Sequence, residues 1–154
     1  MKPEFYKIAT QIRNKIDEYC QNTYDDGHRT HLGASLIGHK CLRKLWFTFR
    51  WVYHHKHSGR MQRLFNTGHK EEKRIIEWLI SSGLEVEYLD ENEKQFRISG
   101  VNGHYGGSID GLITIPELGK CLLECKTSKT GAEFKNLIES GAEKVKPVHF
   151  AQMC

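Results

Sequence analysis

The chain has 154 residues, of which 38% are hydrophobic and 27% charged, and its formal net charge at pH 7 is +4. This length allows one domain with a core of its own, and the composition is ordinary for a soluble globular protein. The sequence has no apolar run near the roughly 18 residues of a membrane span and no signal-peptide core at its start, so we expect a cytoplasmic protein.

The first predicted element is an amphipathic helix from Lys2 to Cys20. Its apolar residues recur at intervals of three and four, as they do along one face of a helix. They are Phe5, Ile8, Ile12, Ile16 and Tyr19. We expect this stripe to pack on the core, with the helix serving as scaffold.

A basic region follows, because residues 28–63 include many Lys and Arg but no Asp or Glu. After a polar loop, Ser35 has the position of an N-cap, and we expect a helix from there to about Trp51. The inner side of this helix would be formed by Cys41, Leu45, Trp46 and Phe49. The outer side would carry Lys40, Arg43, Lys44 and Arg50. Such a face is either simply solvated or binds phosphate groups, and the absence of acidic residues favours phosphate binding.

The rest of the chain alternates between helical and extended patterns. We expect a helix from Leu64 to Ser81, strands at 84–89 and 95–98, a glycine-rich bend at 102–107 and a short helix at 132–138. Pro147 suits the first turn of a further helix. That helix stops after two turns, so we expect a sequence truncated at its C-terminus. The fold class is α/β, with a mixed central sheet flanked by helices.

The most informative stretch is residues 108–127. Two runs rich in Ile and Leu flank a break that contains Pro and Gly, which predicts two strands joined by a tight connection. With a five-residue loop over 116–120, Asp110 lies opposite Lys126 and Leu112 opposite Glu124. Because side chains alternate along a strand, Asp110, Glu124 and Lys126 then project from one face. A loop of four residues would separate them.

Two carboxylates and a lysine on one buried sheet face are costly unless something compensates their charge. The natural compensator for two close carboxylates is a divalent cation, which prefers oxygen ligands. We therefore predict a metal site at Asp110 and Glu124. The five cysteines fit no zinc spacing and are expected to be reduced thiols.

Several motifs occur in a fixed order along residues 35–152. They are A-S-L-I-G-H-K-C-L-R-K-L-W-F from Ala34, G-H-K-E-E ending at Glu72, G-S-I-D-G around Asp110, L-L-E-C-K-T with Glu124 and Lys126, and H-F-A-Q ending at Gln152. In this order the chain resembles the PD-(D/E)xK nuclease superfamily, specifically its RecB-like and phage (lambda-exonuclease-like) branch. The residue before the aspartate is Ile109, where the family pattern has proline.

This resemblance implies a restriction-endonuclease-like core and a nuclease that depends on Mg²⁺ or Mn²⁺. Asp110, Glu124 and the backbone carbonyl of Cys125 would be metal ligands, with Glu72 completing the shell. Lys126 would position or deprotonate the attacking water, and Gln152 would orient the site. Metal and lysine chemistry suit phosphodiester hydrolysis, because a cation polarises the phosphate and an ammonium stabilises developing charge.

The resemblance also divides the chain and suggests partners. Residues 1–63 would be a helical part that grips DNA, with Arg43, Ser35, Lys44 and Arg50 as contacts, and residues 64–154 the catalytic core. The expected partner is DNA, with a recombination or single-strand-annealing protein as a further one, in the host cytoplasm if the protein is phage-encoded. Family members with an iron–sulfur cluster pair a cysteine like Cys41 with three C-terminal ones, and no such trio lies within these residues.

Three functions remain open at this point. The leading hypothesis is a metal-dependent DNA exonuclease of phage recombination or replication. A structure-selective or restriction-type endonuclease would use the same residues, and digestion of closed circular DNA would distinguish it. A catalytically inactive DNA-binding fragment is the third.

Overall fold

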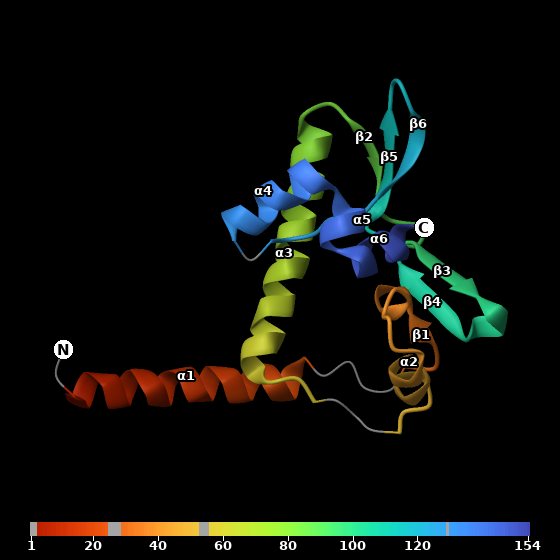
Figure 1. The fold of residues 1–154 in the computed structure, drawn as a ribbon. Helices are drawn as coiled ribbons and strands as arrows, with labels where there is room; N and C mark the ends of the chain where they lie inside the picture. Colours follow the sequence, from red (N-terminus) through yellow and green to blue (C-terminus); the bar gives the residue numbers. More distant parts are fainter. Residues whose placement is uncertain (1–2, 25–28, 53–55, 129) are drawn as a thin grey trace.

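The computed structural model describes residues 3–24, 29–52, 56–128 and 130–154. Within these ranges the chain is mixed α/β, with helices and short strands in the order shown in Figure 1. The long helix α3 (Gly59–Ser81) runs through the middle of the molecule. α1 (Pro3–Thr23) crosses the beginning of α3 and extends away to the left in Figure 1, whereas the strands lie to the right of α3. None of the helices in these ranges is long and apolar enough to cross a membrane.

The first helix forms as predicted, but its apolar stripe does not pack on the core. α1 projects from the molecule as an arm and meets α3 near its own C-terminal end (Figure 1). There Asp17 pairs with Arg63 at 2.8 Å and Cys20 is buried. A Cβ on Gly59 would lie 1.8 Å from the Asp17 carbonyl oxygen, so only glycine allows this crossing. The stripe lies on another face of α1, and its side chains are 44–61% exposed.

The helix predicted from Ser35 to Trp51 is shorter and begins later. Ser35 lies in a 3₁₀ turn (Ala34–Leu36), and α2 spans only Leu42–Phe49, with Cys41 at its N-cap. The chain forms a turn at Gly38 and not the predicted helix. α6 packs closely on this turn, and a Cβ on Gly38 would lie 2.8 Å from the Val148 Cα. The predicted inner stripe is also wrong in part, since Cys41 is exposed and Trp46 is 56% exposed.

The strands form two three-stranded sheets where one central sheet was predicted. In the first, β4 (Tyr105–Ser108) lies between β1 (Leu32–Gly33), which is parallel to it, and β3 (Arg97–Gly100), which is antiparallel. The glycine-rich bend predicted at 102–107 is therefore partly a strand. Its glycines permit close packing, because a Cβ on Gly107 would lie 2.7 Å from the Cβ of Ala34.

The second sheet is antiparallel, with β5 (Gly111–Ile115) between β2 (Glu85–Glu87) and β6 (Gly119–Leu123). β5 and β6 form the predicted hairpin, but its loop has three residues (116–118) and Ile115 pairs with Gly119. Gly119 has a φ of +77°, which a glycine adopts without strain, and this closes the hairpin earlier than expected. The predicted pairing of Leu112 with Glu124 is wrong, since Leu112 pairs with Leu122.

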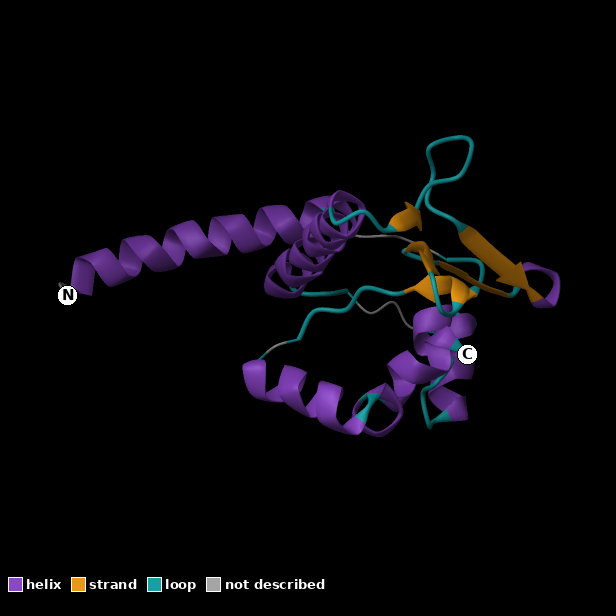
Figure 2. Ribbon diagram, turned by 90° about the horizontal axis from the view of Figure 1, so that it is seen from above, coloured by secondary structure: helices purple, strands orange, loops and turns teal. Residues whose placement is uncertain are grey.

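Three helices follow the hairpin: α4 (Gly131–Ser140), α5 (Ala142–Val145) and α6 (Pro147–Met153). The Thr130 hydroxyl caps α4 by accepting from the Glu133 backbone N–H, and Pro147 begins α6 as predicted. Viewed from above, these helices lie on one side of the strands (Figure 2). α6 packs against the 3₁₀ turn at 34–36, which joins the N-terminal region to the end of the chain.

Candidate functional site

The candidate site lies where β5 begins and β6 ends. The ladder ends at the pair Gly111–Leu123, and one further step in this register places Asp110 opposite Glu124. The predicted partner of Asp110 was Lys126, so the register was wrong by two residues. A shift of two preserves the face on which a side chain lies. The expectation that Asp110, Glu124 and Lys126 share a face therefore survives the shorter loop.

The Asp110 carboxylate contacts the backbone that follows Glu124. Its Oδ2 accepts a hydrogen bond of 2.6 Å from the Cys125 N–H. This bond reaches across the open end of the hairpin and holds the two segments together where the ladder has stopped. It also places the aspartate beside the peptide that joins Glu124 to Cys125.

The Glu124 carboxylate is the most enclosed charge of the site, with a side chain only 5% exposed. Its Oε1 accepts from the Lys126 ammonium and, at 2.9 Å, from the Gln152 amide. Gln152 arrives from α6, which is 28 positions further along the chain. Lys126 and Gln152, the two residues predicted to support the site, thus both contact Glu124. A buried carboxylate needs such hydrogen-bond donors.

Glu72 reaches the site from α3. Its Oε1 accepts a 3.0 Å hydrogen bond from the Gln95 amide. Burial raises the pKa of Glu72, and the nearby carboxylates of Asp110 and Glu124 raise it further, against the opposing effect of His69. These effects indicate that the carboxylates of Glu72, Asp110 and Glu124 lie in one region, where the Lys126 ammonium compensates part of their charge.

The same negative field acts on the Cys125 thiol. Burial raises its pKa to about 11, with Asp110 as the next cause and then the other two carboxylates. On α6, burial lowers the pKa of His149, and the Lys126 and Lys146 ammonium groups lower it further. His149 is therefore neutral near pH 7 beside the lysine of the site.

The donor set suits a hard divalent cation. Asp110 and Glu124 offer carboxylate oxygens, and the hydrogen bonds described above use one oxygen of each carboxylate. The Cys125 carbonyl stays a predicted third ligand. Within the described ranges, no three His, Cys, Asp or Glu side chains are grouped so that they could hold a metal ion. Glu72 thus lies close enough to Asp110 and Glu124 for their charges to raise its pKa, but the three side chains are not grouped closely enough to hold one metal ion.

All four residues predicted to contact DNA are exposed. Ser35 lies before α2, Arg43 and Lys44 lie on it, and Arg50 is its C-cap. The Arg43 guanidinium lies over the Phe47 ring at 5.4 Å, and that of Arg50 lies 6.0 Å from the Trp46 ring. The Lys44 ammonium is 3.3 Å from a His39 ring nitrogen. In the part of the chain that the structure describes, neither arginine nor Lys44 forms a salt bridge, so their charges remain available to an anion.

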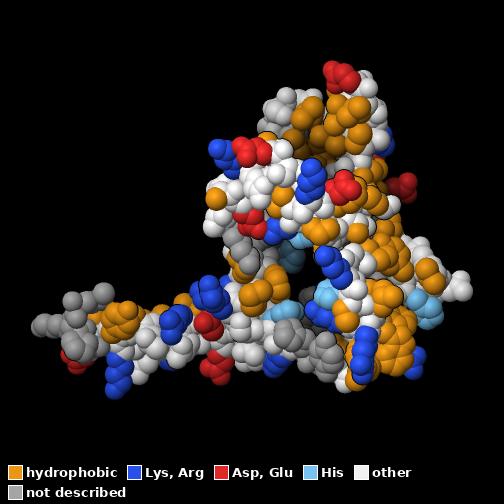
Figure 3. All heavy atoms as spheres, in the orientation of Figure 1, with side chains coloured by type: hydrophobic (Ala, Val, Ile, Leu, Met, Phe, Trp, Pro, Cys, Tyr) orange, Lys and Arg blue, Asp and Glu red, His pale blue; other side chains and the backbone are white. Residues whose placement is uncertain are grey.

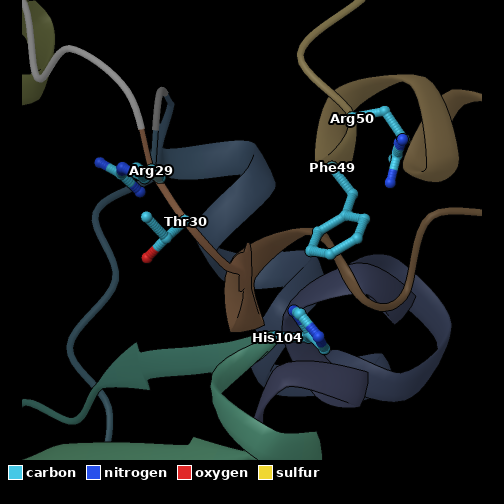
Figure 4. A pocket seen from close by; sticks show the side chains of 5 residues that line it. All are labelled: Arg29, Thr30, Phe49, Arg50 and His104. Carbon is cyan, nitrogen blue, oxygen red and sulfur yellow. The ribbon is translucent and has the colours of Figure 1, made fainter.

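A basic cleft of about 250 Å³ opens beside α2 (Figure 4). Its walls are formed by Arg29, Thr30, Phe49, Arg50 and His104. The Phe49 and His104 rings meet edge to face at 5.4 Å, and the Trp51 indole donates to the Arg29 carbonyl at 2.9 Å. In the space-filling view, Lys, Arg and His side chains surround a hollow between α3 and the part of the molecule that contains α2 and β1 (Figure 3).

Sequence reasoning missed His149 and most residues of the cleft. His149 precedes Gln152 by three positions on one helix, so helical spacing alone would have placed both on one face. Arg29 and His104 are 75 positions apart, and only the pairing of β1 with β4 brings them to one cleft. Nothing in the local sequence indicates that contact.

Comparison of this chain with protein-family models, curated proteins and solved structures finds no match.

Proposed function

We propose that this protein is a metal-dependent deoxyribonuclease with a restriction-endonuclease-like core, and that it acts as an exonuclease. The observation that carries the proposal is the arrangement around Glu124. An almost fully enclosed carboxylate lies beside Asp110 and accepts from both Lys126 and Gln152. A sheet end gains no stability from enclosing the Glu124 carboxylate, because burying a charge costs free energy.

In this proposal Asp110, Glu124 and the Cys125 carbonyl hold Mg²⁺ or Mn²⁺, with Glu72 as a further carboxylate nearby. When bound, the cation polarises the scissile phosphate and lowers the pKa of a water molecule. The Lys126 ammonium, held by Glu124, positions that water and stabilises negative charge on the phosphate. Gln152 fixes the orientation of Glu124.

The basic surface supports DNA as the substrate. Arg43 and Lys44 on α2 and Arg50 at its C-cap carry charges that would neutralise phosphates, and Ser35 adds a hydroxyl on the 3₁₀ turn. α6 packs against that turn and also delivers Gln152 to Glu124. The 3₁₀ turn, which is proposed to bind DNA, therefore packs directly on α6, the helix proposed to support catalysis.

The test is Mg²⁺-dependent degradation of DNA by the Lys126→Ala variant. We expect activity to be lost while circular dichroism and DNA affinity remain those of the wild type. Lys120→Ala is the matched control, because Lys120 is an exposed lysine of the same hairpin that pairs with Glu87. Equal degradation by the wild type and Lys126→Ala would remove the basis of the proposal.

The exonuclease assignment has its own test. Linear and closed circular DNA are incubated with the wild type under the same conditions. We expect degradation of the linear form alone, because an exonuclease needs an end. Cleavage of the circle would instead identify an endonuclease with the same catalytic residues.

A further inference from the structure

The apolar stripe of α1 is left open by the fold. The five side chains at positions 5, 8, 12, 16 and 19 are 44–61% exposed, although they form a continuous apolar face. α3 packs on the side of α1 that carries Asp17 and Cys20, so it covers a different face. In the space-filling view the helix extends away from the body of the molecule with its apolar side chains at the surface (Figure 3).

The spacing of the stripe is symmetric about Ile12. From Phe5 to Tyr19 the intervals are 3, 4, 4 and 3 residues. If a second copy of the helix lies antiparallel with Ile12 on Ile12, then Ile8 meets Ile16 and Phe5 meets Tyr19. Each residue of the stripe thus meets an apolar residue of the other copy, and the residue numbers of two facing positions always add to 24. A partner of different sequence would require no such symmetry, whereas a two-fold interface does.

We propose that two copies of this chain associate through α1, packed antiparallel about a two-fold axis at Ile12. This inference does not depend on the proposed nuclease function. The stripe itself contains no charged residue. The rest of α1 has three basic residues (Lys7, Arg13, Lys15) and three acidic ones (Glu4, Asp17, Glu18), so two copies carry no net charge that would oppose pairing.

The area is sufficient for a modest dimer. Covering the exposed parts of the five side chains on both copies buries about 1,000 Å² in total, at the lower limit for a specific interface. The whole chain exposes 12070 Å². A compact monomer of its 17.9 kDa mass would expose about 8,000 Å². The chain therefore exposes more surface than a compact monomer does, and the apolar stripe of α1 is part of that exposed surface.

The first experiment measures the molar mass in solution by light scattering during size exclusion. We expect about 35.8 kDa for the wild type, twice the 17.9 kDa of the chain. Ile12→Lys places two charges at the axis and should shift the mass to that of one chain. Asn14→Lys adds the same charge at an exposed position on the opposite side of the helix and should remain dimeric. Circular dichroism confirms that both variants fold.

The second experiment tests the register by disulfide cross-linking. In a background with the exposed Cys41 and Cys154 changed to Ser, Ile12→Cys should cross-link to a dimer under oxidation, because the two copies of residue 12 meet at the axis. Phe5→Cys should not, since its copies lie at opposite ends of the interface. A monomeric wild type overturns the proposal, and so does cross-linking at residue 5 that equals cross-linking at residue 12.

Discussion

At the scale of single residues, the site is organised by unequal enclosure of its charges. The Glu124 side chain is 5% exposed, whereas that of Lys126 is 41% exposed. The Lys126 ammonium is therefore accessible from solvent while it donates to the Glu124 carboxylate. The hairpin geometry brings Asp110 to the same place, with its Oδ2 on the Cys125 N–H. These contacts follow from the two-residue alternation of the strands, which is why the sequence could predict that the three side chains share one face.

The raised pKa of the Cys125 thiol reflects its burial first and the nearby carboxylates second. Its pKa of about 11 lies two units above the ordinary 9.0, so at pH 8 its thiolate fraction is about 100-fold below that of an unperturbed thiol. We expect iodoacetamide to modify Cys125 much more slowly than the exposed Cys41, as followed by mass spectrometry of peptides. Unfolding in urea should remove the difference. Equal rates in the folded protein would contradict the raised pKa of this thiol.

His149 gives the site a pH dependence. Its pKa is lowered in the fold by burial and by Lys126 and Lys146, while the unfolded chain binds a proton near the ordinary 6.5. Between the two pKa values the unfolded state holds more protons, so stability falls as pH decreases through 6.5. In urea unfolding across that pH range, we expect His149→Gln to lose less stability than the wild type. Parallel pH profiles for the two proteins would contradict the lowered pKa.

At the scale of elements, α6 makes two contacts that depend on its position. The first is with Gly38, where a Cβ would lie 2.8 Å from both the Ala151 Cβ and the Val148 Cα. The second is the hydrogen bond from the Gln152 amide to Glu124. The close approach at glycine therefore sets the position from which Gln152 reaches the site.

Gly38→Ala should displace α6. We expect a destabilisation of about 1–3 kcal/mol, as for other insertions into tight packing. We also expect a loss of the proposed nuclease activity, because Gln152 would be displaced from Glu124. Urea unfolding and DNA degradation measure the two effects. Gly68→Ala is the control, because no atom lies within 4 Å of its Cβ and the residue is inside α3. That change should stabilise the protein by about 0.5–1 kcal/mol and leave activity intact.

At the scale of the whole molecule, the sequence predicted local elements better than their assembly. The helices, the hairpin and the helix at Pro147 arise from periodicity and turn residues, which are local signals. The strand at Gly106 and Gly107 was missed because their role is to let Ala34 and His31 approach, and such contacts leave no local pattern. Periodicity also identified the apolar face of α1 but not what covers it.

The candidate site also combines residues that are close in the sequence with residues that only the fold brings together. Asp110, Glu124 and Lys126 lie within one hairpin, so alternation along two strands could group them. Glu72 and Gln152 were placed by resemblance to a family, and the fold brings both to the end of the hairpin. The basic cleft depends on pairing between β1 and β4 and could not be anticipated.

The most direct test of the central claim is calorimetric titration of Mn²⁺ into the wild type and into Asp110→Asn and Glu124→Gln. The account predicts a metal site in the wild type that is lost in both variants, because each removes one of the paired carboxylates. Glu117→Gln, which changes an exposed carboxylate in the loop of the same hairpin, should bind as the wild type does. No binding by the wild type, or equal binding by all four proteins, would contradict it.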